Sequence, residues 1–200
     1  MMKVLLFGHS YVRDLCQLRP AVREFVLEKS QTEIKLFYKY FPGRDFKYFL
    51  DHPTELECIR NIEPDFIFVI LGGNTIVNEL DSQTIKWYCR NFYVLLRQYI
   101  PSSCKIIASE VELRFCLSNN RFNAPTEDTF QRKRRNLNFF MKDRLKKQGT
   151  IDHMFFLGGT GGLMLADYFR TDGVHLNLRG LTKLRQMIKR MIRYAVEGSE

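Results

Sequence analysis

The chain has 200 residues, a net charge of +9, 45% hydrophobic residues and 26% charged residues. These values are typical of a soluble globular domain that buries a core of its own. They exclude a membrane-spanning chain, because no stretch approaches the roughly 20 apolar residues that cross a bilayer. The apolar run at residues 4–7 is also too short for a signal peptide. We therefore expect one domain over residues 1–200 in an intracellular, cytoplasmic protein. Its oligomeric state and the length of the parent polypeptide stay open.

Five short, β-rich apolar runs predict strands. They lie at Lys3–Phe7, Glu33–Phe41, Asp65–Leu71, Lys105–Ala108 and Ile151–Leu157. The third run, DFIFVIL, is apolar almost throughout, which is typical of a strand covered by helices on both faces.

Apolar residues at intervals of three to four predict the helices between these strands. The predicted helices are Val12–Lys29 (divided at Pro20), Asp81–Ile100, Thr126–Gln148 and Leu178–Val196. Gly149 is a credible stop for the third helix. Strands that alternate with helices favour an α/β sandwich with a largely parallel sheet.

Two segments hold most of the basic residues. Residues 131–147 contain eight Lys or Arg against one acid, and residues 179–193 contain six with no acid. Together they exceed the net charge of the chain, so the remainder is net acidic. This distribution favours an anionic partner, either lipid headgroups or a nucleic-acid backbone. A basic face opposite an apolar stripe is about equally often an ordinary solvated helix surface. Within the first segment, we expect residues 139–141 (FFM) to lie in the core.

The cysteines and histidines predict no metal site. The five cysteines are scattered, odd in number and never form a C-x-x-C pair, so we expect them to be reduced. They are Cys16, Cys58, Cys89, Cys104 and Cys116. His52 and His153 stand in separate segments, and we expect neither a metal nor a cofactor.

Chemistry-bearing residues follow several of the predicted strands. In a parallel α/β sheet, ligands bind outside the carboxyl ends of the strands. Ser10 follows the first strand, Gly43 the second and Asn74 the third, while Asp172 and His175 precede the last helix. Each alone has an ordinary explanation: a turn for Ser10 or Gly43, a helix cap for Asp172, a structural role for His175. Their joint occurrence at strand ends favours a site.

Four blocks carry a resemblance to a known family. FGHSYVRDL, YFPGR, VILGGNTIV and TDGVHLNLRG resemble the SGNH (GDSL-like) hydrolases, and the resemblance runs from Lys3 to the final helix. TDGVHLNLRG is the most specific block. The combination of GHSYVRDL with LGGN is also similar to the esterase-like domains in first-open-reading-frame proteins of LINE-type retrotransposons. The chain departs from the family at His9, where many members have Asp, and at Thr75, where an acidic residue is common.

The resemblance implies a role for each residue. Ser10 would be the nucleophile, His175 the general base and then the general acid, and Asp172 the residue that orients His175. The oxyanion would be bound by the backbone N–H groups of Ser10 and Gly43 and by the side-chain amide of Asn74. We expect a flavodoxin-like three-layer α/β/α sandwich with a mainly parallel, five-stranded sheet.

Elementary chemistry agrees with these roles. A serine hydroxyl needs an imidazole to accept its proton, and a carboxylate three residues before the histidine can reach its other ring nitrogen. His9 is not expected to be the base, because adjacent side chains that leave a strand tend to point apart. The glycine-rich stretch 158–162 lacks the Lys-Ser/Thr of a phosphate loop, so we expect it to lead to Asp172. The stretch 110–125 is the longest predicted loop, and such loops often line a functional site.

Two hypotheses follow. The first is a serine esterase of short, acetyl-like carboxylic esters, on small acyl esters or lipids, that works through an acyl-enzyme. The second is a lipid- or RNA-binding module of a retrotransposon protein whose esterase activity is weak or dispensable. In it, residues 131–147 and 179–193 would bind an anionic membrane or a nucleic acid.

Overall fold

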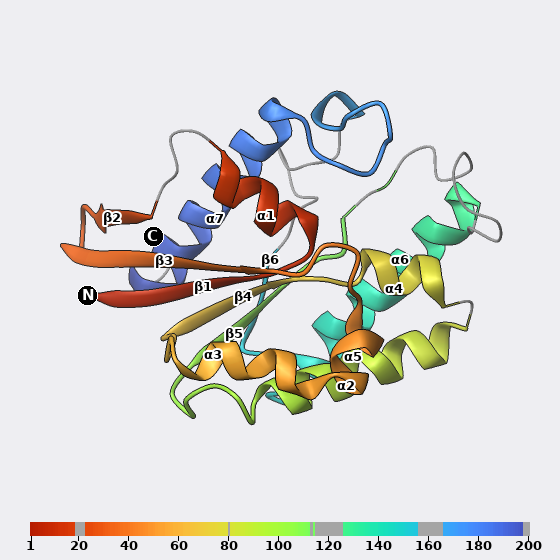
Figure 1. Ribbon diagram of the computed structural model, residues 1–200, viewed down its shortest axis with the longest axis horizontal. Helices are drawn as coiled ribbons and strands as arrows, with labels where there is room; N and C mark the ends of the chain where they lie inside the picture. The colour runs from red at the N-terminus through yellow and green to blue at the C-terminus, as the bar shows by residue number, and fades with distance from the viewer. Residues whose placement is uncertain (19–22, 80, 113, 115–125, 156–165, 198–200) are drawn as a thin grey trace.

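The architecture is a six-stranded sheet between two layers of helices (Figure 1). The computed structural model describes residues 1–18, 23–79, 81–112, 114, 126–155 and 166–197. The strands are β1 (Met2–Gly8), β2 (Glu24–Leu27), β3 (Thr32–Tyr40), β4 (Phe66–Ile70), β5 (Lys105–Ser109) and β6 (His153–Phe155). Their order is β2-β3-β1-β4-β5-β6, and every pair is parallel except β2 with β3. The expected α/β fold with a mainly parallel sheet is thus confirmed.

The described helices are of very different lengths. They are α1 (Ser10–Gln17), α2 (Phe46–Asp51), α3 (Glu57–Arg60), α4 (Gly73–Asn78), α5 (Ser82–Leu96), α6 (Glu127–Phe140) and α7 (Leu178–Glu197). Three single turns accompany them: the 3₁₀ turns η1 (Pro53–Leu56) and η4 (Ala166–Tyr168), and the π-helical turn η3 (Met141–Leu145), which continues α6.

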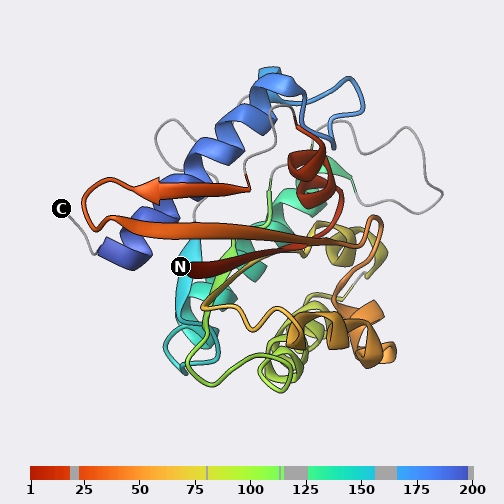
Figure 2. The ribbon, with the colours of Figure 1, turned by 60° about the vertical axis from the view of Figure 1, so that its left-hand side comes forward.

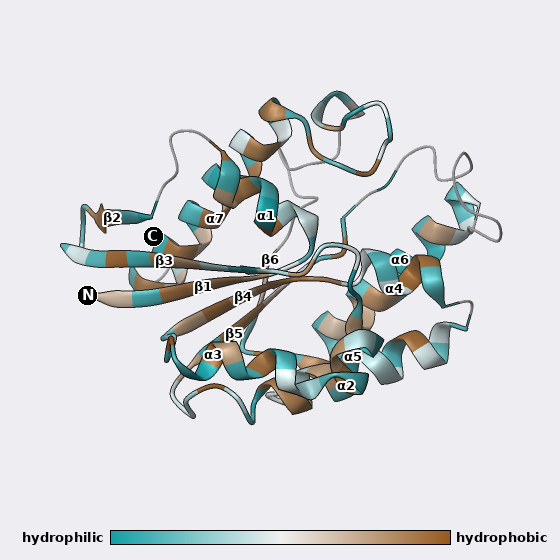
Figure 3. Cartoon of the chain, in the orientation of Figure 1, coloured by the Kyte–Doolittle hydropathy of each residue, from teal (hydrophilic) through white to brown (hydrophobic). Residues whose placement is uncertain are grey.

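The core has two halves, one on each face of the sheet. Along β1, Leu5 and Phe7 pack toward α2, α5 and α6, whereas Val4 and Leu6 pack toward α1 and α7. This follows from the two-residue period of a strand, which sends successive side chains to opposite faces. Figures 1 and 2 show α1 and α7 together on one side of the sheet. Figure 3 shows the apolar colour running along the central strands, while the helices are polar outward.

The sheet has six strands where the sequence predicted five. Residues 24–27 were expected in a helix, but they form the edge strand β2, antiparallel to β3. Their burial alternates weakly, with Phe25 half-buried and Val26 exposed. Strand β2 obtains its hydrogen bonds from β3, the next strand in the chain, so its β-branched and aromatic residues follow the sheet instead of a helix. The predicted break at Pro20 lies outside the described residues.

The other predicted elements are largely present. Helix α5 has Asp81 as its N-cap, with the carboxylate accepting from the Thr84 N–H, and ends four residues before Ile100. Helix α6 and its π turn end before Gly149, whose φ of +70° suits a glycine. The short helices α2, α3 and α4 were not predicted, because four to six residues are too few for a helical period to show.

Several expectations concern residues with no description. The stretch 158–162, Cys116 and most of the predicted loop 110–125 lie outside the described residues. The four described cysteines are free thiols. Within the described ranges, no helix is both long and apolar enough to cross a membrane.

Candidate active site

The spatial order of the strands brings the loops that hold Ser10, Gly43 and Asn74 to one edge of the sheet. Strand β1 lies between β3 and β4, with Gly8 paired to Tyr40 on one side and to Ile70 on the other. The loops after these strands therefore leave the sheet at the same level. The connection after β1 runs to one face of the sheet and the connection after β3 runs to the other. Ligands of doubly wound sheets usually bind at such a point.

Ser10 is the first residue of α1, directly after the turn that ends β1. The turn is tight because Gly8 lies against β4: a Cβ on Gly8 would come within 2.3 Å of the Ile70 carbonyl oxygen. The side chain of His9 caps α1 by accepting from the Tyr11 N–H. Ser10 thus stands at the positive end of a helix, with its own N–H in the first, unpaired turn.

Asp172 and His175 form a tight pair. Asp172 Oδ2 lies 2.7 Å from His175 Nδ1, and its other oxygen accepts from the backbone N–H groups of Val174 and His175, both at 2.8 Å. Burial raises the pKa of Asp172, but these hydrogen bonds outweigh it and hold the pKa below its ordinary value. The carboxylate therefore stays ionised and fixes His175 with Nδ1 as the donor, which leaves Nε2 free to accept a proton.

A hydrogen bond ties the Asp172–His175 loop to the Ser10 turn. The hydroxyl of Tyr11 donates to the Val174 carbonyl oxygen at 2.6 Å, so the residue after Ser10 holds the residue before His175. Tyr11 is buried, and burial raises the pKa of its hydroxyl well above the ordinary value. In this structure, however, Ser10 Oγ is hydrogen-bonded to His9 Nδ1 at 3.5 Å, and no hydrogen bond joins it to His175 within the described residues.

The two other predicted oxyanion donors are neighbours. Gly43 has a φ of +78°, in the left-handed region that glycine occupies most easily. The Asn74 side-chain nitrogen donates to the carbonyl of Arg44, the residue after Gly43, at 3.1 Å. Thr75 supports this loop, because its hydroxyl accepts from the Phe46 N–H at 3.2 Å. Within the described residues, the Gly43 N–H donates no hydrogen bond to another backbone group.

The glycine pair before Asn74 is explained by packing. Gly72 has a φ of +116°, and a Cβ there would come within 2.6 Å of Val111. A Cβ on Gly73 would come within 2.3 Å of Arg114 Nη2 and 2.7 Å of Glu112 Oε1. The sequence LGGN therefore does more than turn the chain: its second glycine makes room for a buried ion pair.

This ion pair was missed in the sequence. His9, Glu112 and Arg114 are 1%, 2% and 5% exposed, and Glu112 Oε1 lies 3.4 Å from both His9 Nε2 and Arg114 Nη2. His9 was expected to point away from Ser10, but it lies buried between Ser10 and Glu112. The only sequence signal was the E-x-R spacing that follows β5.

The basic segments are less exposed than their sequence suggests. In α6, Lys133 is buried and donates to the Glu79 carbonyl, and burial lowers its pKa. Arg134 donates hydrogen bonds to Gln131 Oε1 and to the Val111 carbonyl oxygen. Residues 139–141 were expected in the core, and Met141 is, but Phe139 is 67% exposed.

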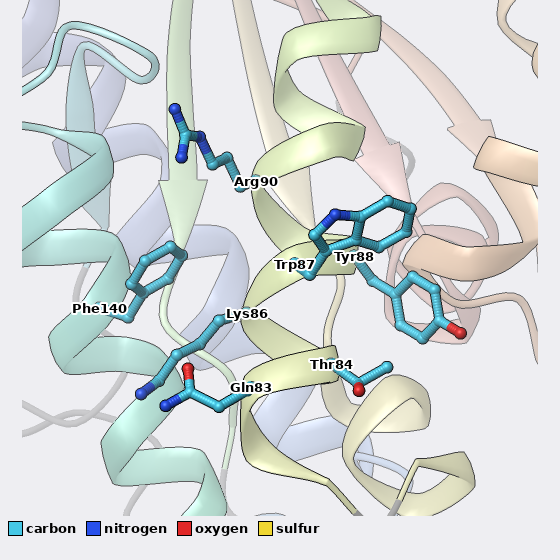
Figure 4. A pocket seen from close by; sticks show the side chains of 7 residues that line it. All are labelled: Gln83, Thr84, Lys86, Trp87, Tyr88, Arg90 and Phe140. Carbon is cyan, nitrogen blue, oxygen red and sulfur yellow. The ribbon is translucent and has the colours of Figure 1, made fainter.

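An open hollow of about 540 Å³ lies over α5, beside α6. Figure 4 shows Lys86 and Gln83 on the side of α5 that faces Phe140, with Trp87 and Tyr88 on the other side of the helix. Trp87 is 58% exposed. This surface was not predicted, and it holds none of the predicted site residues.

No metal centre is evident in the described part of the chain. There, no three His, Cys, Asp or Glu side chains gather as a metal would require. The site is thus a serine at a helix N-terminus, an aspartate–histidine pair and polar donors on neighbouring loops.

This fold is the one found in GDSL-like lipases and acylhydrolases of known structure. The lipase/acylhydrolase from Enterococcus faecalis matches with a TM-score of 0.66 and 16% identity over 100% of both chains. A GDSL-like lipase from Bacteroides thetaiotaomicron matches with a TM-score of 0.64 and 16% identity, over 97% of this chain and 89% of that one. An acetylxylan esterase from Geobacillus stearothermophilus matches with a TM-score of 0.59 and 15% identity, over 96% and 94%. No protein-family model matches the sequence, and no curated protein matches it significantly.

Proposed function

We propose that the protein is a serine esterase that hydrolyses carboxylic esters through an acyl-enzyme. The observation that carries the proposal is the Asp172–His175 pair, 2.7 Å apart, held beside the Ser10 turn by the bond from Tyr11 to Val174. A carboxylate paired with an imidazole beside a serine turn supports the proposal, because serine hydrolases on unrelated folds use these three groups together.

The mechanism follows from the protonation of the pair. With Nδ1–H donated to Asp172, His175 Nε2 accepts the Ser10 proton as Oγ forms a bond to the ester carbonyl carbon. The imidazolium then gives that proton to the leaving alkoxide as the carbon–oxygen bond breaks. Water, deprotonated by His175, then attacks the acyl carbon. As the bond from that carbon to Ser10 Oγ breaks, the imidazolium returns the proton to Oγ, which releases the acid and free Ser10. Since Ser10 Oγ is hydrogen-bonded to His9 Nδ1 in this structure, it must turn toward His175 for the first of these steps.

The tetrahedral intermediate carries a negative charge on its former carbonyl oxygen. The Ser10 and Gly43 N–H groups and the second hydrogen of the Asn74 amide are the proposed oxyanion donors. Loss of one such donor typically costs about 10²–10³ in rate.

We propose a short, acetyl-like acyl group for the substrate. The likeness of the fold to that of an acetylxylan esterase supports this preference. A small acyl ester and a lipid ester both satisfy the proposal.

The test is hydrolysis of an acyl-length series of aryl esters together with labelling by a fluorophosphonate probe. Ser10→Ala should abolish both, and His175→Ala should lower kcat by on the order of 10⁴. Ser103→Ala, an exposed serine in the turn before β5, is the matched control and should retain both. Labelling or hydrolysis that survives Ser10→Ala would exclude Ser10 as the nucleophile.

A second candidate function is binding of an anionic surface, either lipid or RNA. It is favoured by Arg132 and Arg135, which are exposed on α6 together with the exposed ring of Phe139. Cations beside exposed aromatic rings suit both the interface of an anionic membrane and a single-stranded nucleic acid.

A further inference from the structure

A chain of polar and charged side chains, most of them buried, links the proposed nucleophile to a proposed oxyanion donor. It runs from Ser10 Oγ to His9 Nδ1 (3.5 Å), from His9 Nε2 to Glu112 Oε1 (3.4 Å), and from Glu112 Oε1 to Arg114 Nη2 (3.4 Å). Arg114 Nη2 also donates to Asn74 Oδ1 at 3.1 Å. The chain thus joins the proposed nucleophile to the proposed oxyanion amide through the interior.

Arg114 decides which end of the Asn74 amide faces the strand ends. A guanidinium only donates, so the amide atom against it must be oxygen. The amide nitrogen is then turned toward the Arg44 carbonyl and the Gly43 loop, where one of its two hydrogens is bonded. If the amide rotated by half a turn, its oxygen would face the developing oxyanion and repel it. The guanidinium therefore selects the rotamer that catalysis needs.

Glu112 holds the other end of the chain. His9 Nδ1 accepts from the Tyr11 N–H, so the ring proton lies on Nε2, which contacts Glu112 Oε1 at 3.4 Å. The same carboxylate neutralises Arg114, which would otherwise be an isolated buried charge.

This arrangement is costly as a purely structural device. His9 Nε2, Glu112 Oε2 and Arg114 Nε are buried without a hydrogen-bond partner within the described residues. Buried ion pairs are seldom more stabilising than apolar side chains of the same volume, because each ion loses its hydration. A second glycine, Gly73, is also needed to make room for the pair.

We propose that Arg114 and Glu112 are positioning residues of the active site, which hold the Asn74 amide and the Ser10 turn in the orientation that stabilises the oxyanion. The inference rests on the proposed function. Neither residue touches substrate; both act through their neighbours. The substrate's ground state is bound without the oxyanion, so their loss should lower kcat and leave KM nearly unchanged.

The experiment is a double-mutant cycle between Arg114 and Asn74 on the best aryl ester. Asn74→Ala should lower kcat by about 10²–10³. Arg114→Met should lower kcat by on the order of 10² with KM changed less than about threefold, since small misplacements of catalytic groups cost this much. Arg114→Lys, which keeps a charge and a donor but not the planar fork, should be intermediate. In the Asn74→Ala background, Arg114→Met should cost less than about threefold more, because its target is gone.

Arg114→Met strands a buried carboxylate, so the cycle is repeated with Glu112→Gln/Arg114→Met, in which both charges are removed, and thermal unfolding is recorded for each variant. A wild-type kcat in either variant, or equal losses with and without Asn74, would overturn the positioning role alone, provided that Ser10→Ala is inactive. Hydrolysis that survives Ser10→Ala, or a wild-type protein that hydrolyses no ester, would overturn the proposed function and this inference with it.

Discussion

At the scale of single residues, Glu112 is the most perturbed acid near the site. Burial by itself raises the pKa of its carboxyl, but His9 and Arg114 outweigh burial and lower the pKa to about 2. The carboxylate is thus ionised throughout the range in which an esterase would be assayed, and its pairing with His9 and Arg114 persists over that range.

This lowered pKa predicts how stability depends on pH. Because the folded pKa (about 2) lies below the unfolded value (4.5), the unfolded chain binds more protons between these two pH values. The stabilisation is complete above the unfolded pKa and is lost as pH falls toward 2, with a slope of up to about 1.4 kcal/mol per pH unit. In Glu112→Gln, the urea-derived unfolding free energy should fall less steeply between pH 5 and pH 3. Parallel curves for the two proteins would contradict this.

At the scale of elements, the start of α7 is what holds the Asp172–His175 loop. Asn177 Oδ1 accepts from the Gly180 N–H at 3.0 Å as a helix cap. Its amide nitrogen donates to the carbonyls of Asp167 and Phe169 at 2.7 and 3.1 Å. One side chain therefore joins the helix to the segment before Asp172.

Removing this side chain should destabilise the protein through three hydrogen bonds. Asn177→Ala should lower the unfolding free energy by about 2 kcal/mol or more in urea titrations. Asn177→Asp, which keeps the cap oxygen and loses the two donors, should lie between that variant and the wild type. Thr182→Ala is the control on the same helix, because its hydroxyl bonds only to Leu178 one turn earlier and should matter by less than about 0.5 kcal/mol. Equal losses in Asn177→Ala and Thr182→Ala would show that the hydrogen bonds of the Asn177 side chain contribute no special stability.

At the scale of the whole molecule, the two basic segments do not form one surface. Helix α6 packs on one face of the sheet and α7 on the other. A flat membrane or a short RNA would therefore contact mainly one of them. The exposed rings of Trp87 and Phe139 lie on the α5 and α6 side.

This separation supplies a matched test of the second candidate function. Arg132→Gln/Arg135→Gln on α6 and Arg190→Gln/Arg193→Gln on α7 remove the same charge from opposite layers, and all four side chains are exposed. If α6 binds, the first pair should weaken retention on anionic vesicles or single-stranded RNA by about 1 kcal/mol per charge at low salt. The second pair should have little effect. Equal weakening by both pairs would point to net charge alone.

The sequence by itself determined the alternation of strands and helices and the residues at the strand ends. Ser10 and Asn74 could be selected because a parallel sheet brings the carboxyl ends of its strands to one edge, and His175 was added by the resemblance of its sequence block. The tertiary structure alone decided β2 and the pairing of His9 with Glu112. A short edge strand obtains its hydrogen bonds from the strand beside it, and the buried ion pair joins residues far apart in the chain; hydrophobic periodicity reports neither. The sequence shows that Ser10 is next to His9, but only the fold brings Glu112 into contact with His9.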